Sequence, residues 1–97
     1  MSTHYILEQE FQNHHFEQNA IKHTEYEKCL FDRCDFSRCD FLAVSFIDCV
    51  FSHCHFDGAK INYVALRTAS FHHCSMKDIN FAMSDKLLFD IALHHCV

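Results

Sequence analysis

Residues 31–41 read Phe31-Asp32-Arg33-Cys34-Asp35-Phe36-Ser37-Arg38-Cys39-Asp40-Phe41, so a phenylalanine returns every five residues. The series extends in both directions without an insertion, and each fifth position from 11 to 81 holds a large apolar residue. Its fifteen members are Phe11, Phe16, Ile21, Tyr26, Phe31, Phe36, Phe41, Phe46, Phe51, Phe56, Ile61, Leu66, Phe71, Met76 and Phe81. An internal repeat of this regularity decides the architecture before any single residue is considered.

A period of five fits neither regular element. On an α-helix, successive members would drift about 140° around the axis and spread over every face. On a flat strand, an odd step would send alternate members to opposite sides of the sheet. A chain that turns a corner in the same direction after each pentad brings every fifth side chain to one axis. The period therefore predicts a solenoid of short extended segments.

A second column of small or medium residues stands two positions before each large one. Its members are Cys29, Cys34, Cys39, Val44, Cys49, Cys54, Ala59, Val64, Ala69 and Cys74. A small inward residue beside a large one lets successive layers interdigitate. We expect these cysteines to be buried, reduced and inert, because seven is an odd number for a disulfide scaffold.

The segments 34–38 and 39–41, which read Cys-Asp-Phe-Ser-Arg and Cys-Asp-Phe, resemble the pentapeptide-repeat family. The family pattern is A(D/N)LXX, and here cysteine replaces alanine while phenylalanine replaces leucine. The resemblance implies an all-β fold, a right-handed quadrilateral β-helix with four pentads in each coil. It predicts about four and a half coils for this chain. The residues themselves support four corners over three only weakly. Most residue identities that are found four pentads apart would also be found at any other whole number of pentads.

The length of 97 residues suits one domain, a single solenoid over 1–97. We expect a regular array over about 9–81 and an irregular last coil over 82–97. Continuing the register places Lys86 inward beside Leu66 and returns Ile91 and Cys96 to inward positions. Because a buried unpaired lysine is costly, the chain either bulges at 84–88 or lets Lys86 reach solvent from an open end. The chain could also be the N-terminal part of a longer solenoid.

Neither catalysis nor a cofactor is expected. The sequence has no phosphate-binding glycine loop, nucleophile elbow or H-E-x-x-H motif. Ten histidines raise the question of zinc, and His53 and His73 would stack on the outer face as a two-ligand fragment. Two ligands do not make a structural site, and the cysteines point inward. A metal-binding or redox module of Cys and His stays the third functional hypothesis.

The formal charge is −5, with 13 acidic and 8 basic residues, which disfavours direct nucleic-acid binding. No apolar run approaches the ~18 residues of a membrane span, and 1–10 lacks a secretory pattern, so we expect a cytoplasmic protein.

The Phe- and Cys-rich segment 31–39 is similar to the early coils of the Qnr and MfpA-like group. That resemblance implies a DNA-mimicking protein that binds DNA gyrase or topoisomerase IV and protects it from quinolones. An interaction scaffold for an unrelated partner is the alternative.

Two surfaces are predicted to bind partners. The first comprises acidic residues on the outer side, Asp35, Asp40, Asp48 and Asp57. For Asp35 and Asp40 the alternative is a carboxylate that caps a local turn. The second is the apolar last coil, with Leu87, Leu88, Phe89, Ile91 and Leu93, which predicts a homodimer through 84–97. The N-terminal coil, with Gln9, His14 and Asn19 in the small column, is expected to be the more polar cap.

Overall fold

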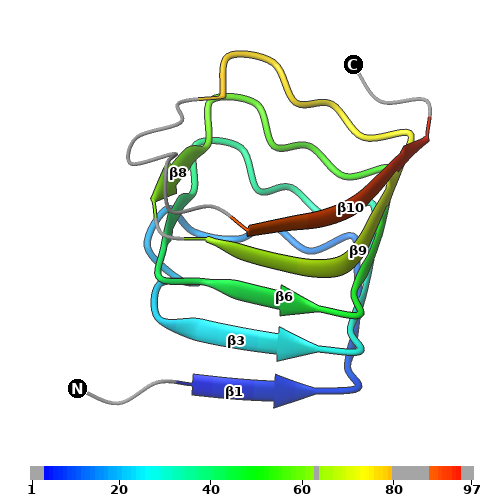
Figure 1. Ribbon diagram of the computed structural model, residues 1–97. Helices are drawn as coiled ribbons and strands as arrows, with labels where there is room; N and C mark the ends of the chain where they lie inside the picture. Colours follow the sequence, from blue (N-terminus) through cyan, green and yellow to red (C-terminus); the bar gives the residue numbers. More distant parts are fainter. Residues whose placement is uncertain (1–3, 63, 80–87, 95–97) are drawn as a thin grey trace.

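The structure is a computed structural model in which residues 4–62, 64–79 and 88–94 are described. Every regular element in these ranges is a β-strand, and the strands stack into a right-handed coil (Figure 1). They are β1 (His4–Leu7), β2 (Glu10–Gln12), β3 (Thr24–Glu27), β4 (Leu30–Asp32), β5 (Asp40–Leu42), β6 (Ser45–Ile47), β7 (Val50–Ser52), β8 (Lys60–Asn62), β9 (Ala65–His72) and β10 (Leu88–His94). Within the described residues, no helix is long and apolar enough to cross a membrane.

The coil has four sides, because strands that lie four pentads apart in the sequence pair in parallel. On the first face, β1, β3, β6 and the start of β9 stack in order. The second face contains β2, β4, β7 and the end of β9. Single bridges connect positions 15, 35, 55 and 75 on the third face, and β5 pairs with β8 on the fourth. The quadrilateral β-helix expected from the pentads is confirmed.

The number of regular coils is smaller than expected. On the second face Glu10 pairs with Leu30, Leu30 with Val50 and Val50 with Ser70, which makes three steps of four pentads each. The first and third faces also show three such steps. The regular part therefore comprises about three turns rather than four and a half.

The corners are made by residues with positive φ, one in nearly every pentad. They are Glu8, Asn13, His23, Lys28, Arg33, Arg38, Ala43, Asp48, His53, Gly58, Thr68, His73 and Asp78, with φ between 52° and 72°. The left-handed conformation bends the chain sharply and so separates one face from the next. It costs an L-residue roughly 1–2 kcal/mol. Backbone hydrogen bonds to the next coil, such as Lys28 N to Ile47 O at 2.8 Å, help to offset that cost.

Gly58 is a corner where a side chain would combine backbone strain with a close contact. Its φ is +72°, and a Cβ there would lie 3.3 Å from Cγ of Arg38. We expect Gly58→Ala to lower the free energy of unfolding by about 1 kcal/mol or slightly more. The reverse change at another corner, Ala43→Gly, should stabilise the protein or leave it unchanged. Equilibrium urea unfolding measures both, and a Gly58→Ala variant more stable than the parent would contradict this account of the corners.

The core consists of columns of stacked rings inside the coil. Phe11, Phe31, Phe51 and Phe71 form one column, with successive ring centroids 5.0, 4.8 and 4.7 Å apart. Phe16, Phe36 and Phe56 form a second, at 4.5 and 5.0 Å, and Met76 packs against the core as its partly buried extension. The inward position expected for every fifth residue is confirmed for these seven phenylalanines and for Met76. Rings in neighbouring columns meet edge to face, as Phe46 and Phe51 do at 5.0 Å, a favoured arrangement for aromatic pairs.

The small column is buried as predicted and adds a hydrogen-bond ladder. Six described cysteines are buried and form no disulfide, namely Cys29, Cys34, Cys39, Cys49, Cys54 and Cys74. Each thiol donates to the carbonyl of the large residue in the coil below. Examples are Cys34 to Phe11 O and Cys54 to Phe31 O, both at 3.3 Å. Cysteine thus fills a small inward site and also gives a second donor to a ladder carbonyl.

The last strand departs from the extrapolated register. β10 pairs with β9 so that Phe89, not Lys86, lies beside Leu66. The separation in sequence between these paired residues is therefore three positions longer than four pentads. A bulge between Asp90 and Ile91 then changes the step, and Leu93 lies beside Phe71. The expected place of Ile91 in the large column, beside Phe71, is therefore wrong, since Ile91 aligns with Ala69 of the small column and Leu93 takes the place beside Phe71. Lys86 and Cys96 themselves lie outside the described residues.

Candidate protein-binding surface

The four predicted aspartates do not gather on one side of the coil. Asp35 and Asp57 belong to the third face, and Asp40 begins β5 on the fourth. Asp48 forms the corner between the first and second faces, as Glu8 and Lys28 do in the coils below. This corner lies diagonally opposite the one between the third and fourth faces. The four carboxylates therefore cannot contact a single flat partner surface together.

Asp35 acts mainly on its own backbone. Its Oδ1 accepts a hydrogen bond from Ser37 N at 2.9 Å, and its Oδ2 lies 3.1 Å from Nδ1 of His15 in the coil below. The hydrogen bonds from Ser37 and the contact with His15 hold the pKa of Asp35 below its usual value. The turn-capping interpretation is confirmed for this residue. Asp40 instead forms an ion pair with Lys22, at 3.5 Å.

Asp57 joins two neighbouring coils on the third face. Its Oδ1 accepts hydrogen bonds from Ser75 Oγ at 2.6 Å and from Lys77 N at 2.9 Å. These two donors, that of Ser75 first, lower the pKa of Asp57. The carboxylate is thus occupied within the molecule as an acceptor that fixes the next turn.

Acidification should reveal this role. Because the pKa of Asp57 is lower in the folded than in the unfolded state, its contribution to stability is complete above about pH 4 and is lost as the pH falls through the folded-state pKa. In Asp57→Asn the amide oxygen can accept the same two hydrogen bonds without titrating. We expect the variant to lose less stability than the parent between pH 5 and about pH 2, measured by urea unfolding at each pH. Parallel curves for the two proteins would contradict this role.

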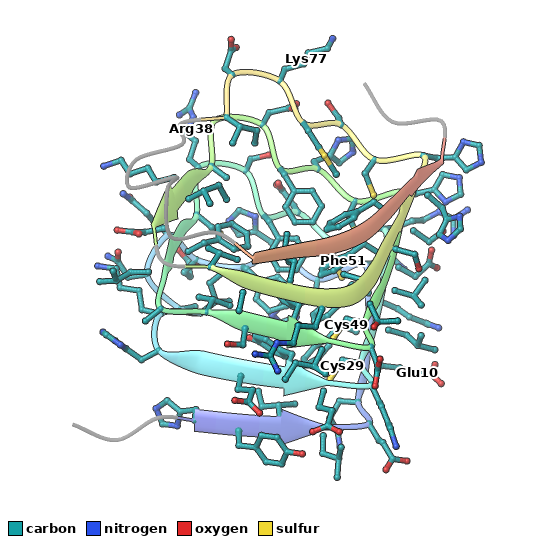
Figure 2. All side chains as sticks on the ribbon, in the orientation of Figure 1. Glu10, Cys29, Arg38, Cys49, Phe51 and Lys77 are labelled. Atoms are coloured by element: carbon teal, nitrogen blue, oxygen red, sulfur yellow. The ribbon has the colours of Figure 1, made fainter. Side chains whose placement is uncertain are left out.

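A different set of acidic residues gathers at the corner between the first and second faces. We call it the acidic corner and define it by Tyr5, Leu7, Glu8, Glu10, Glu25, Glu27, Lys28, Leu30, Asp32, Ile47, Asp48 and Val50. Their side chains face outward, because the inward positions between them hold buried residues such as Tyr26 and Phe31. Figure 2 shows Glu10 on this outer side, with Phe51, Cys29 and Cys49 within the coil.

The net charge of the protein comes from this corner. It holds six acidic residues and one basic residue, Lys28, whereas the whole chain has 13 and 8. Seven acidic and seven basic residues remain elsewhere and balance each other. Asp32 is paired with Arg33 at 3.1 Å, and Tyr5 Oη donates to Glu27 Oε1 at 2.7 Å. That hydrogen bond raises the pKa of Tyr5 to about 12, while Glu8, Glu10 and Asp48 are exposed.

Asp48 is the one residue of this corner that the pentad pattern predicted to contact a partner. The glutamates at 8, 10, 25 and 27 precede the most regular pentads and occupy different positions within them. The available signal was the coil length. Writing the sequence in rows of four pentads places 8, 28 and 48 in one column, with 10 and 30 beside them.

The predicted histidine pair is present as a ring stack. His53 and His73 occupy equivalent corners, with centroids 5.0 Å apart and planes inclined by 13°. His53 Nδ1 also lies 3.0 Å from Ser52 Oγ. In the part of the chain that the structure describes, no three His, Cys, Asp or Glu residues lie close enough to hold a metal ion. The arrangement offers two imidazoles and no third ligand there.

The apolar C-terminal set is partly described. Leu88, Phe89, Ile91 and Leu93 belong to β10, whereas Leu87 lies outside the described residues. Among described strands β10 pairs only with β9, and Figure 1 shows it as the last rung of the stack. The strand thus ends the described sheet, as the dimer prediction requires.

Comparison with known proteins supports the repeat. Residues 29–72 match the pentapeptide repeats family in eight copies. No curated protein sequence matches the chain.

The solved structures to which the chain is similar include the following three. A trypsin-treated variant of QnrB1, a plasmid-mediated fluoroquinolone resistance protein, gives a TM-score of 0.61 at 18% identity and covers 96% of this chain and 54% of that one. Full-length QnrB1 gives 0.57 at 14%, with 98% and 57% covered. The pentapeptide repeat protein Rfr23 from the cyanobacterium Cyanothece 51142 gives 0.45 at 8%, with 97% and 87% covered. The chain spans about half the length of the QnrB1 structures, whose fold it shares.

Proposed function

Because this chain is a pentapeptide-repeat protein, we propose that it is a non-enzymatic, protein-binding solenoid that binds DNA gyrase or topoisomerase IV and protects it from quinolones. The observation that carries the proposal is the acidic corner, which concentrates the net charge on one edge of a stacked coil. The fold shared with QnrB1, a fluoroquinolone resistance protein, supports the choice of partner.

The geometry suits a partner that normally binds DNA. Equivalent corner residues such as Glu8, Lys28 and Asp48 follow one another at the strand spacing of about 4.8 Å along the coil axis. The excess of carboxylates over Lys28 on this rigid edge produces a negative potential that attracts a cationic surface and speeds association. Asp48 and the neighbouring glutamates are the proposed contacts. Asp35, Asp40 and Asp57 would contribute less, since each already has a partner within the molecule.

Binding of purified gyrase to the immobilised chain tests the proposal. We expect saturable binding whose Kd rises steeply between 50 and 300 mM salt, because exposed charges are screened. The double variant Glu8→Gln/Asp48→Asn should bind at least about tenfold more weakly. Asp78→Asn is the matched control, since Asp78 is an exposed corner aspartate with φ 56° between the third and fourth faces. No binding by the parent chain, or equal losses in both variants, would reject the proposal.

The second candidate is a scaffold for an unrelated protein, favoured by the apolar strand β10 at the end of the stack. A free parallel edge can pair with a second chain, so we propose a homodimer through 84–97 in the cytoplasm. Sedimentation at high micromolar concentration separates the possibilities, because a strict monomer there would reject the dimer.

A further inference from the structure

The exposed large apolar side chains of the described residues also lie at the acidic corner. They are Tyr5, Leu7 and Leu30, which are 54%, 40% and 44% exposed. Tyr5 and Leu7 point outward from β1, and Leu30 points outward from β4 across the corner. Large apolar groups scattered singly need no explanation, but three at one corner beside the exposed carboxylates of Glu8, Glu10 and Asp48 do.

The apolar strip continues along the coil axis. Val50 lies directly above Leu30 in the second face, at the paired position of β7, and is half-buried. Ile47, which ends β6, is half-buried on the other side of the corner from Val50. These residues do not serve the core, because Phe31, Phe46 and Phe51 already fill the inward positions between them. The sequence thus places apolar residues outward at positions where the repeat allows polar ones.

We infer that the acidic corner docks a protein segment whose apolar side chains are flanked by lysine or arginine. The inference rests on the proposed function and deepens it, because it names the contact surface and the chemistry of the partner. Apart from Asp32, which is paired with Arg33, five carboxylates against one lysine select a cationic partner. The strip of Leu7, Leu30 and Val50 selects apolar side chains and excludes water from the contact. A surface that only imitated DNA phosphates would gain nothing from exposed leucines.

Two consequences distinguish this contact from a purely ionic one. Part of the affinity should survive high salt, because burial of apolar surface is not screened. Removal of the leucines should also weaken binding without changing the net charge. The loss expected for one half-exposed leucine is about tenfold in Kd.

The probe is a short synthetic peptide of leucine and lysine, titrated into the isotopically labelled full chain and followed by NMR. We expect backbone amide shifts at 5–10, 25–30 and 47–50, and retained binding at about 0.5 M salt. A peptide of equal charge with serine in place of leucine should bind at least about tenfold more weakly. Leu7→Thr/Leu30→Thr should weaken the leucine–lysine peptide by about tenfold or more, since threonine suits a strand but removes apolar area. Leu42→Thr is the matched control, an outward, half-buried leucine of β5 on the fourth face.

The outcomes separate the two proposals. Shifts confined to the acidic corner, with a loss in Leu7→Thr/Leu30→Thr and none in Leu42→Thr, support the inference even if gyrase does not bind, and then only the proposed partner fails. Shifts elsewhere, no binding, or equal binding of the serine and leucine peptides overturn the inference. Unchanged amide spectra away from each substitution verify that the variants are folded.

Discussion

Replacing Phe51 by alanine is expected to lower the free energy of unfolding by about 3–5 kcal/mol. Its ring is fully buried and stacks on Phe31 at 4.8 Å and on Phe71 at 4.7 Å. It also meets Phe46 and Phe56 edge to face, at 5.0 and 5.4 Å. The substitution opens a cavity in the middle of a column that supports the coils on both sides, and a rigid backbone ladder cannot collapse to fill it. Urea unfolding at equilibrium measures the loss.

Two further variants keep this test informative if Phe51→Ala does not fold. Phe51→Leu should retain most of the buried area and lose less stability. Leu30→Ala removes an outward, half-exposed side chain and should change stability by less than about 1 kcal/mol. A loss below about 1 kcal/mol for Phe51→Ala would show that the column is not the source of stability.

The second large effect concerns the buried thiols. In a Cys96→Ser background we expect the six remaining cysteines to react with a thiol reagent at least about a thousandfold more slowly in the native state than in denaturant. The thiols lie inside the coil, and burial raises the pKa of Cys39 to about 11 and that of Cys49 to about 12. A hydrogen bond with Cys74 together with burial raises the pKa of Cys54 as well. Little reactive thiolate is therefore present at neutral pH, and reaction requires opening of the coil.

The time course of labelling separates this account from its alternative. If the coil opens cooperatively, Cys34, Cys54 and Cys74 should be labelled together and at one rate, as mass spectrometry of quenched samples would detect. Rapid native labelling of these three would contradict their burial. Early labelling of Cys74 alone would instead indicate that the C-terminal coil opens separately.

The fold could be predicted from the sequence because one spacing of five residues governs both the large and the small inward column. Substitutions such as Val44 or Ala59 for cysteine do not disturb that period. The corners were harder to specify. Lys28, Arg33 and Ala43 adopt positive φ although nothing in these side chains favours it. Hydrogen bonding and ring stacking between coils impose the conformation, so it is a tertiary effect without a local signal.

The ends of the array were predicted less well than its middle. A repeat predicts the next coil only while its spacing holds, and the extra residues before β10 shift Phe89 rather than Lys86 to the place beside Leu66. At the N-terminus, Gln9, His14 and Asn19 are exposed as a polar cap would be. Outward apolar residues of β1 accompany them.

The binding surface required the coil length as well as the period. Asp35, Asp40, Asp48 and Asp57 were selected by their place in regular pentads, and three of them proved to bond within the molecule. The charge that remains available comes from residues 8 to 27 together with Asp48. These residues meet only because each coil takes four pentads. Side-chain chemistry in sequence therefore indicated the sign of the charge but not its position.

Gyrase supercoiling in the presence of a fluoroquinolone tests the central claim most directly. With gyrase held at a drug concentration that blocks supercoiling, adding the parent chain should restore the supercoiled product, and Asp78→Asn should restore it equally. Glu8→Gln/Asp48→Asn should require at least about tenfold more protein for the same recovery. The account is contradicted if the parent chain restores no supercoiling at any concentration, or if the acidic-corner variant protects as well as the parent.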